Sequence, residues 1–336
     1  MKLISFIIPA HNCAATIENT VKSIETVQID SEIIIVENGS SDDTSDVVYS
    51  LADQYKNIRL FTSDKGVSKA RNKGIDVSMG DWIVFIDADD ESLRGIETMR
   101  EHLSMQCLDL IIGSYKKDND IIRHDYSTMN TGVENTDELK SWLISRPTLR
   151  MQAWAKIYRT SFLKENKLRF NEDLSYSEDS EFVIRAIVKA QKVMITDVPF
   201  YHYHSGTISA MRGFVEGRIE KYITALEAAE SDVEGESSVI KHAFIDYVIA
   251  HINIMGVHDV FGCEVKETWR NRCREMRNLM QESVIERTLN GKSISKNLQS
   301  LPVLLCRYHL TALSGVIYYT RSLQNRKRYI KAGNYE

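Results

Sequence analysis

Two aspartates, Asp87 and Asp89, follow directly after the apolar run Trp82–Ile86. Residues i and i+2 of an extended chain point to the same side, so both carboxylates would face one point with Ala88 turned away. That spacing suits Mg²⁺ or Mn²⁺, which is held by few carboxylates and completes its shell with substrate phosphates. An acidic turn that caps the next helix is the alternative, because Asp is a favoured N-cap residue. The position after an apolar strand favours the cation site.

A second acidic pair, Glu178-Asp179, precedes the apolar helical pattern that begins at Phe182. Carboxylates at a helix N-terminus complement the helix dipole, which is the structural explanation. A carboxylate is also what a displacement reaction needs to take the proton of an attacking hydroxyl. Other acids and phosphates nearby would raise the pKa of such a carboxyl group. The pair is therefore a candidate general base.

Basic and polar residues mark two further loops. The segment Lys65–Gly74 opens a helix, and a helix N-terminus with Lys65 and Arg71 suits a diphosphate. The turn Glu37–Thr44 places a carboxylate at a strand end, where Glu37 could accept a hydrogen bond from a base or a ribose. Helix capping by Asp42 or Asp43 is compatible with that role.

The elements that would position these residues alternate between apolar runs and amphipathic stretches. Such alternation predicts an α/β fold with a mostly parallel sheet flanked by helices, whose ligands bind at the carboxyl ends of the strands. The predicted strands are Ser5–Ile8, Glu32–Val36, Ile58–Phe61, Trp82–Ile86 and Leu108–Ile112. The predicted helices between them are Ala14–Glu25, Thr44–Ala52, Val67–Val77 and Leu93–Leu103.

The remainder of the chain becomes helical beyond Gly213. Periodic apolar residues predict helices over Glu216–Ala229, Val239–Met255, Glu267–Arg287 and Thr311–Arg328. We therefore predict three regions: 1–115 as a nucleotide-binding half, 116–213 as an acceptor and base half, and 214–336 as a helical region with a basic tail.

Composition limits the class of protein. Apolar residues make up 43% and charged residues 26% of 336 residues, as in ordinary globular proteins. The five cysteines have no CxxC spacing, which favours a reducing compartment over a disulfide framework. No apolar stretch reaches the roughly 18 residues of a membrane span, and the first apolar run stops at Pro9. These features predict a cytoplasmic protein.

The charge is unevenly distributed along the chain. Residues 287–335 carry nine Lys or Arg and no Asp or Glu, although the whole chain has a net charge of −5. With the apolar stretches Leu301–Leu305 and Leu310–Tyr319, this pattern predicts peripheral attachment to an anionic membrane surface. A helical subdomain that packs on the catalytic domain and forms a homodimer is the alternative. We expect no nucleic-acid binding, because the acidic body would oppose it.

Taken together, the motifs resemble glycosyltransferase family 2, which has the GT-A fold. They occur in the family's order across residues 3 to about 210, and no motif beyond 215 matches. The matching segments are Phe6–Asn12, Glu37–Asp42, Gly66–Ile75, Asp81–Asp90, Trp154–Tyr158 and Glu178–Phe182.

The resemblance implies an inverting transfer of a sugar from a nucleotide-sugar, commonly a UDP-sugar, to a hydroxyl of an acceptor glycan, itself lipid-linked in some settings. It implies bacterial cell-surface polysaccharide synthesis as the setting. By resemblance, Asp179 is the catalytic base with Glu178 in support, Asp89 and Asp87 hold Mn²⁺ or Mg²⁺, and Trp154 and Lys156 lie near the donor sugar and acceptor. The remaining donor-binding residues would be Pro9, His11, Glu37, Asp64, Lys65, Arg71, Asp87 and Ala88.

Two departures and two alternatives accompany the resemblance. The family's turn usually carries two aspartates where this chain has Glu37 and Asn38. Some relatives place a metal-binding histidine near the Tyr201–His204 segment, so His204 or His202 would be a further ligand, or both pack structurally. The alternatives to a glycosyltransferase are a sugar-phosphate nucleotidyltransferase, which the glycine-free loop after Ile8 argues against, and a non-catalytic nucleotide-sugar-binding module.

Overall fold

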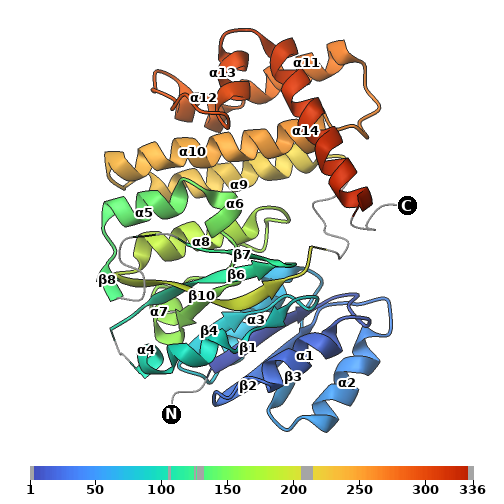
Figure 1. The fold of residues 1–336 in the computed structure, drawn as a ribbon, viewed down its shortest axis with the longest axis vertical. Coiled ribbons are helices and arrows are strands. Elements are labelled where there is room, and N and C mark those ends of the chain that lie inside the picture. The colour runs from blue at the N-terminus through green and yellow to red at the C-terminus, as the bar shows by residue number, and fades with distance from the viewer. Residues whose placement is uncertain (1–3, 105–106, 125, 127–131, 206–214, 332–336) are drawn as a thin grey trace. The chain divides into compact units, whose positions relative to one another are not determined.

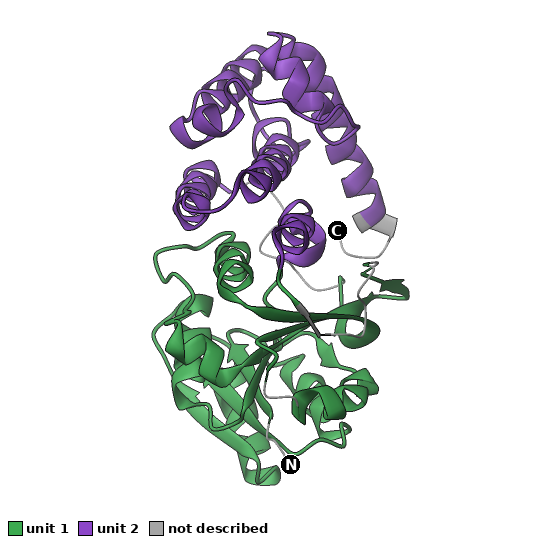
Figure 2. Ribbon diagram, turned by 90° about the vertical axis from the view of Figure 1, so that its left-hand side faces the viewer, with its two compact units in different colours: residues 1–135, 152–205 green, residues 136–151, 206–336 purple. Residues whose placement is uncertain are grey.

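The computed structural model describes residues 4–104, 107–124, 126, 132–205 and 215–331. The chain divides into two compact units, shown in Figure 2. Unit 1 comprises residues 1–135 and 152–205, and unit 2 comprises residues 136–151 and 206–336. Residues 136–151, which the sequence pattern assigned to the acceptor half, group with the helical unit. The expected boundary at residue 213 lies outside the described residues.

Unit 1 is built on a ten-stranded sheet with helices on both faces (Figure 1). Eight strands follow the order β3-β2-β1-β4-β9-β6-β10-β5, while β7 pairs with β6 and β8 pairs with β10. The strands are β1 (Ile4–Ala10), β2 (Ser31–Glu37), β3 (Ile58–Thr62), β4 (Trp82–Phe85), β5 (Glu91–Ser92), β6 (Leu110–Lys117), β7 (Asp120–Ile122), β8 (Gly132–Glu134), β9 (Lys156–Arg159) and β10 (Lys192–Tyr203).

The predicted α/β class is confirmed, and the sheet has two differently built halves. Strands β3, β2, β1 and β4 are parallel, as the continuous apolar runs predicted. Strand β9 runs antiparallel to both β4 and β6, so the second half is mixed. The sequence Lys156–Arg159 has a charged residue at each end, which is why no apolar run revealed β9.

The helices of unit 1 largely follow the predicted positions. An exception is the predicted helix 93–103, which is a 3₁₀ turn followed by one short α-helix. The elements are α1 (Ile17–Glu25), α2 (Thr44–Gln54), α3 (Val67–Val77), η1 (Arg94–Met99), α4 (Arg100–Ser104), α7 (Thr160–Glu165) and α8 (Glu178–Lys189).

Alternate residues of the central strands face opposite layers. Ile4, Phe6 and Ile8 of β1 share a buried core with Ile17 and Val21 of α1. On the opposite face, α3 approaches β1 closely, because a Cβ on Gly74 would lie 2.4 Å from Cγ2 of Ile7. Glycine at this position therefore lets the helix that carries Arg71 pack directly on the sheet.

Unit 2 contains only helices among its described residues. The predicted helix 267–287 is interrupted at Gln281-Glu282, which separates α11 from α12. No described helix is both long and apolar enough to cross a membrane. The elements are α5 (Asp137–Ile144), α6 (Pro147–Arg150), α9 (Arg218–Val233), α10 (Ser238–Met255), the π-helical turn η2 (Gly256–Val260), α11 (Trp269–Met280), α12 (Ser283–Leu289), α13 (Leu301–Arg307) and α14 (Thr311–Lys331).

Candidate active site

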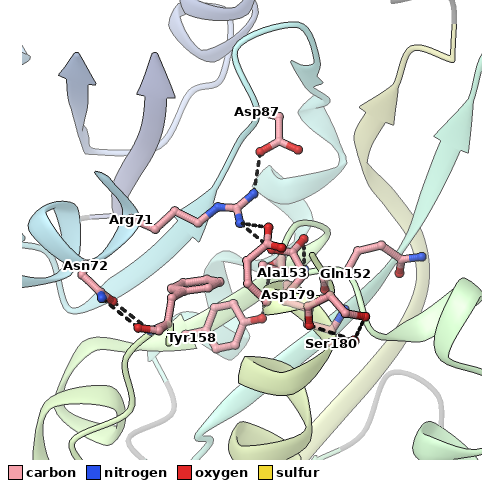
Figure 3. A network of polar contacts seen from close by, with 12 residues as sticks. Arg71, Asn72, Asp87, Gln152, Ala153, Tyr158, Asp179 and Ser180 are labelled. Atoms are coloured by element: carbon pink, nitrogen blue, oxygen red, sulfur yellow. Dashed lines mark hydrogen bonds and ion pairs between the residues drawn. The ribbon is translucent and has the colours of Figure 1, made fainter. Parts of the chain in front are cut away.

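The candidate site is organised around the guanidinium of Arg71 (Figure 3). Its side chain is only 4% exposed and is paired with three carboxylates. Nη2 lies 3.0 Å from Oδ1 of Asp87, and Nη1 lies 3.4 Å from Oε1 of Glu178. Nη1 also pairs with Oδ1 of Asp179. The structure thus brings together four of the residues selected from the sequence.

Local structure explains how these residues meet. Arg71 lies in the second turn of α3, and Asp87 follows β4 at its carboxyl end. Glu178 and Asp179 open α8, next to Ser177, whose φ of 60° turns the chain into the helix. Because α3 and α8 lie on the same face of the sheet, their side chains converge beside the end of β4.

A neighbouring hydrogen-bond pair secures α3 to the segment before α8. Asn72 Nδ2 donates to the Phe170 carbonyl oxygen at 2.9 Å, and the Phe170 amide donates back to Asn72 Oδ1 at 2.8 Å. Figure 3 shows this pair beside the Arg71 cluster. The Arg71 guanidinium also lies over the aromatic ring of Phe170, with Cζ of Arg71 5.1 Å from the ring centroid. These contacts fix the position of Arg71 relative to the acidic pair.

The Asp179 carboxylate has partners on both oxygens. Oδ1 pairs with Arg71, and Oδ2 accepts a hydrogen bond of 3.3 Å from the Ala153 amide. This arrangement holds the carboxylate between α3 and the segment that leads into β9 (Figure 3). Its orientation is therefore determined by the fold before any substrate binds.

Burial and mutual repulsion strongly perturb the acids of the cluster. Burial, followed by the charge of Asp179, raises the pKa of Glu178 to about 7. Burial also raises the pKa of Asp87, although the adjacent Arg71 opposes that shift. Burial alone would lower the pKa of Arg71, but the carboxylates, Asp179 first, hold it well above its ordinary value. Such perturbed groups at a strand end are typical of functional sites.

The Asp87–Asp90 loop separates two kinds of carboxylate. Among the described residues, none forms a hydrogen bond or an ion pair with the half-buried Asp89 carboxylate. Its oxygens could therefore serve as ligands of a metal ion. Asp90, in contrast, is buried. Its carboxylate accepts a hydrogen bond of 2.6 Å from the Tyr201 hydroxyl and one of 2.8 Å from the His204 amide. Burial raises the pKa of Asp90 to about 8. Asp90 therefore attaches the loop to β10 and leaves Asp89 available.

The loops after β1 and β2 are joined to each other. The Asn38 amide donates to the Ala10 carbonyl oxygen at 3.0 Å, and the Ser41 amide donates to Asn12 Oδ1 at 2.8 Å. Glu37 Oε1 accepts a hydrogen bond of 2.6 Å from the Ser40 amide. Burial would raise the pKa of Glu37, but hydrogen bonds from Ser40 and Gly39 together hold it below its ordinary value. Glu37 thus stabilises the turn, with Gly39 at a φ of 83°.

Two buried polar atoms beside this turn lack a partner. They are Nδ1 of His11 and Oδ1 of Asn38, and neither hydrogen-bonds to a described residue. Pro9 is buried in β1, two residues before His11. Unsatisfied buried polar atoms are uncommon, and at the carboxyl ends of parallel strands they mark a place where a ligand's polar edge would bind. The sequence selected Glu37 here and missed Asn38 as the unsatisfied acceptor.

The remaining residues that we expected to bind the donor are Asp64, Lys65 and Ala88. Asp64 and Lys65 are exposed in the loop before Gly66, and Asp64 Oδ2 lies 3.5 Å from Lys69 Nζ. Ala88 is buried. Contact of these residues with a diphosphate stays a prediction.

Trp154 and Lys156 are buried on either side of Ala155. The Trp154 ring stacks on Tyr201, with centroids 4.6 Å apart, and on Tyr203 at 5.4 Å. Lys156 Nζ donates to the Gln152 carbonyl oxygen at 2.5 Å. Burial lowers the pKa of Lys156 to about 7, while the charge of Asp179 opposes that shift. Lys156 therefore belongs to the electrostatic surroundings of the acidic pair.

His202 and His204 lie with Glu91, a residue that we did not select from the sequence. Their ligand atoms and a Glu91 carboxylate oxygen are all within 4.8 Å of one another. Neither Asp87 nor Asp89 belongs to this group. Strand pairing of β10 with β5, which sets His202 opposite Glu91, was not visible in the sequence because β5 has only two residues.

Comparison with known proteins relates the chain to glycosyltransferases. Residues 5–167 match the family model "Glycosyl transferase family 2". The chain is 30% identical over 213 residues to the uncharacterized glycosyltransferase EpsJ of Bacillus subtilis, with 60% of each chain covered. It is 29% identical to the GalNAc(5)-diNAcBac-PP-undecaprenol β-1,3-glucosyltransferase of Campylobacter jejuni, covering 54% of this chain and 59% of that relative.

A solved structure extends the similarity in fold to nearly the whole chain. Residues 1–349 of Staphylococcus aureus TarS, in complex with UDP-GlcNAc, align with a TM-score of 0.70 and 20% identity. The alignment covers 97% of this chain and 92% of that one. From the matched family model, the similar relatives and the shared architecture, residues 5–167 belong to glycosyl transferase family 2, and the chain has the GT-A fold.

Proposed function

We propose that this glycosyltransferase moves a sugar from a UDP-sugar to a hydroxyl of an acceptor glycan, with inversion at the anomeric carbon and with Asp179 as general base. The observation that carries the proposal is the placement of Asp179 and Asp87 on the same guanidinium, that of Arg71. One carboxylate belongs to the nucleotide-binding strand end and the other to the acceptor half. Donor and acceptor would therefore meet at this cluster.

The proposed chemistry is a single displacement. Asp179 takes the proton of the acceptor hydroxyl while that oxygen attacks the anomeric carbon, and the nucleoside diphosphate leaves with the bonding electrons. The guanidinium of Arg71, a residue that we expected to border the diphosphate, is paired with three carboxylates. Its part is to orient Asp87 and Asp179, a positioning effect.

A divalent cation completes the proposed site. Asp89, with Asp87 beside it, would hold Mn²⁺ or Mg²⁺, whose charge neutralises that of the departing diphosphate. The half-buried Asp89 carboxylate without a partner among the described residues supports this role. The chain's own groups would then supply binding, orientation and proton removal.

The unsatisfied atoms beside β1 and β2 support a nucleoside pocket. Oδ1 of Asn38 could accept from the imide N–H of uracil, and Nδ1 of His11 offers a second polar contact. TarS, solved with UDP-GlcNAc, has a similar fold, which favours a UDP-sugar over other donors. The undecaprenol-linked substrate in the name of the Campylobacter relative favours a lipid-linked glycan in bacterial surface polysaccharide synthesis. The sequence match spans 60% of the length of EpsJ and 59% of the length of the Campylobacter relative.

A panel of nucleotide-sugars tests the proposal. The full chain is incubated with each donor, with and without Mn²⁺ or Mg²⁺, and released nucleoside diphosphate is measured. We expect metal-dependent release of UDP from one UDP-sugar. Metal-independent binding without turnover would favour the non-catalytic module. Formation of a nucleotide-sugar from a sugar phosphate and a nucleoside triphosphate would establish the nucleotidyltransferase instead.

We also propose that α13 and α14 attach unit 2 to an anionic membrane surface. Apolar side chains are exposed there, among them Tyr308 at 71%, Leu313 at 55% and Val316 at 53%. The same segment has an excess of Lys and Arg, with no acid between residues 287 and 335. One face of α14 is covered, because Ser314 and Tyr318 are buried, but the face with Leu313 and Val316 is not. An apolar face with basic neighbours suits the interface of an anionic bilayer.

Liposome flotation tests this attachment. We expect binding to vesicles that contain phosphatidylglycerol at low salt, weaker binding at high salt, and loss of binding in Leu313→Asp/Val316→Asp. Val239→Asp, at an exposed apolar position on α10, is the matched control for added charge. No binding at low salt would reject the proposal, and concentration-dependent dimers that disappear in Leu313→Asp/Val316→Asp would establish the homodimer alternative.

A further inference from the structure

A cluster of side chains that could hold a metal ion lies where β5 pairs with β10 in unit 1. It comprises Glu91, His202 and His204, whose ligand atoms are all within 4.8 Å of one another. The β5–β10 pairing sets His202 opposite Glu91. His204, two residues after His202, points to the same side of the extended chain. The strands thus direct all three side chains to one point.

The hydrogen bonds of His202 define which ring nitrogen faces the cluster. Nε2 lies 3.0 Å from the Asp118 carbonyl oxygen, which only accepts, so Nε2 carries hydrogen. Nδ1 then faces Glu91 Oε2 at 3.2 Å. In the neutral ring, Nδ1 of His202 then carries a lone pair that is directed at the Glu91 carboxylate. The lone pair and the carboxylate repel each other unless a cation lies between them.

The distances match those between ligands of one metal ion. Two ligands about 2.0 Å from a tetrahedral ion lie roughly 3.3 Å apart. The two pairs measured here, Glu91 Oε2 to His202 Nδ1 and Glu91 Oε1 to His204 Nε2, are 3.2 and 3.5 Å. A metal-bound histidine also commonly donates its other N–H to a backbone carbonyl, as His202 does to Asp118.

We propose that Glu91, His202 and His204 form a transition-metal site, separate from the cation site of Asp87 and Asp89, that binds Zn²⁺ or a similar ion with a water at the fourth position. Two imidazoles and one carboxylate favour Zn²⁺, Co²⁺ or Ni²⁺, whereas an all-carboxylate site with phosphates favours Mg²⁺ or Mn²⁺. The sequence suggested one histidine as an extra ligand of the catalytic cation. The structure groups both histidines with Glu91 instead.

The position of this site gives it a structural effect on the catalytic loop. Glu91 directly follows Asp90, whose carboxylate accepts from the Tyr201 hydroxyl and the His204 amide. A metal that joins Glu91 to β10 would therefore fix the end of the Asp87–Asp90 loop. It would stabilise the loop without contact with the donor.

Metal binding without any nucleotide tests the proposal. The full chain, free of a polyhistidine tag and stripped with a chelator, is titrated with Co²⁺ in excess Mg²⁺, and visible absorption is recorded. We expect stoichiometric binding with the d–d bands of a four- or five-coordinate site, displaced by Zn²⁺. Affinity should fall at least ~10-fold in His204→Ala and in Glu91→Gln. Neither side chain is fully buried, and circular dichroism would verify folding.

Two controls separate this site from the catalytic cation. Asp89→Asn should retain Co²⁺ binding, and so should His242→Ala, which removes an exposed histidine of α10. Absence of Co²⁺ binding in the wild-type chain would overturn the proposal. Loss of binding in Asp89→Asn with retention in His204→Ala would also overturn it. Neither outcome depends on which donor sugar is used.

Discussion

Arg71 and Asp179 form an ion pair that joins α3 to the start of α8, and the same guanidinium reaches Asp87 at 3.0 Å. The carboxylate proposed as base and the carboxylate that follows β4 are thereby held by a single side chain. The planar guanidinium has donors that diverge at fixed angles, which suits this bridging. Arg71 therefore links the two halves of the proposed reaction site.

Arg71→Lys tests that link. An ammonium group keeps the charge but cannot hold both carboxylates in the fixed geometry of a guanidinium. We expect kcat to fall about 100-fold through misplacement of Asp179, with a smaller change in UDP affinity. The free energy of unfolding should fall by about 1–3 kcal/mol, measured by urea denaturation.

Arg169→Lys is the matched control, because Arg169 pairs with Asp76 at an exposed position. Exposed pairs contribute little, so a change below about 1 kcal/mol and an unaltered kcat are expected. A wild-type kcat in Arg71→Lys would show that bridging by the guanidinium is dispensable.

Asp89→Asn should weaken binding of the divalent cation at the proposed active site. An amide oxygen is a poorer ligand for Mn²⁺ than a carboxylate, so the Mn²⁺ concentration for half-maximal activity should rise at least ~10-fold. Asp81→Asn is the control, since Asp81 is an exposed acid directly before β4, at the opposite end of that strand. Equal metal dependence in Asp89→Asn and the wild type would remove Asp89 from the cation site.

Asn38→Ala tests the nucleoside pocket. Because Oδ1 of Asn38 has no partner among the described residues, its removal should cost the fold little and should weaken UDP binding about 10-fold in calorimetry. Asn19→Ala, at an exposed position on α1, should bind UDP as the wild type does. An unchanged affinity of Asn38→Ala for UDP would show that the uracil base binds elsewhere.

His251 gives unit 2 a predictable dependence on pH. Burial lowers the pKa of His251 to about 4, below its value near 6.5 in the unfolded chain. Between these two values the unfolded state binds the extra proton, so stability is present above pH 6.5 and is lost as pH falls toward 4. The slope would be up to about 1.4 kcal/mol per pH unit.

His251→Gln should remove that part of the acid destabilisation of unit 2, measured by urea denaturation from pH 7.5 to 5. His242→Gln, an exposed position on the same helix α10, should leave the slope unchanged. An equal slope in the wild type and in His251→Gln would contradict the assigned cause.

The parallel half of the sheet was predictable, because β1, β2 and β4 are buried on both faces and their sequences are largely apolar. The antiparallel half was not, since β9 and β5 are short and acquire their pairing from distant residues. The grouping of residues 136–151 with the C-terminal helices likewise depends on tertiary contacts. Local periodicity carries no information about either feature.

Residue types and their place at strand or helix ends were sufficient to select Arg71, Asp87, Glu178 and Asp179. They did not show that Arg71 would contact all three acids, because that depends on how α3 and α8 pack. Asp90 and Tyr201 were missed for a related reason. Their hydrogen bond joins residues of separate strands and leaves no pattern in the sequence.

Asp179→Asn gives the most direct test of the central claim. The amide keeps the size of the side chain and a hydrogen-bond acceptor for the Ala153 amide, but it cannot take a proton. We predict that UDP-sugar affinity stays within about threefold of wild type while transfer falls by about 10²–10⁴. Asp173→Asn, an exposed acid before α8, is the control and should be fully active. Transfer by Asp179→Asn at the wild-type rate, with the donor bound normally, would contradict the assignment of Asp179 as the base.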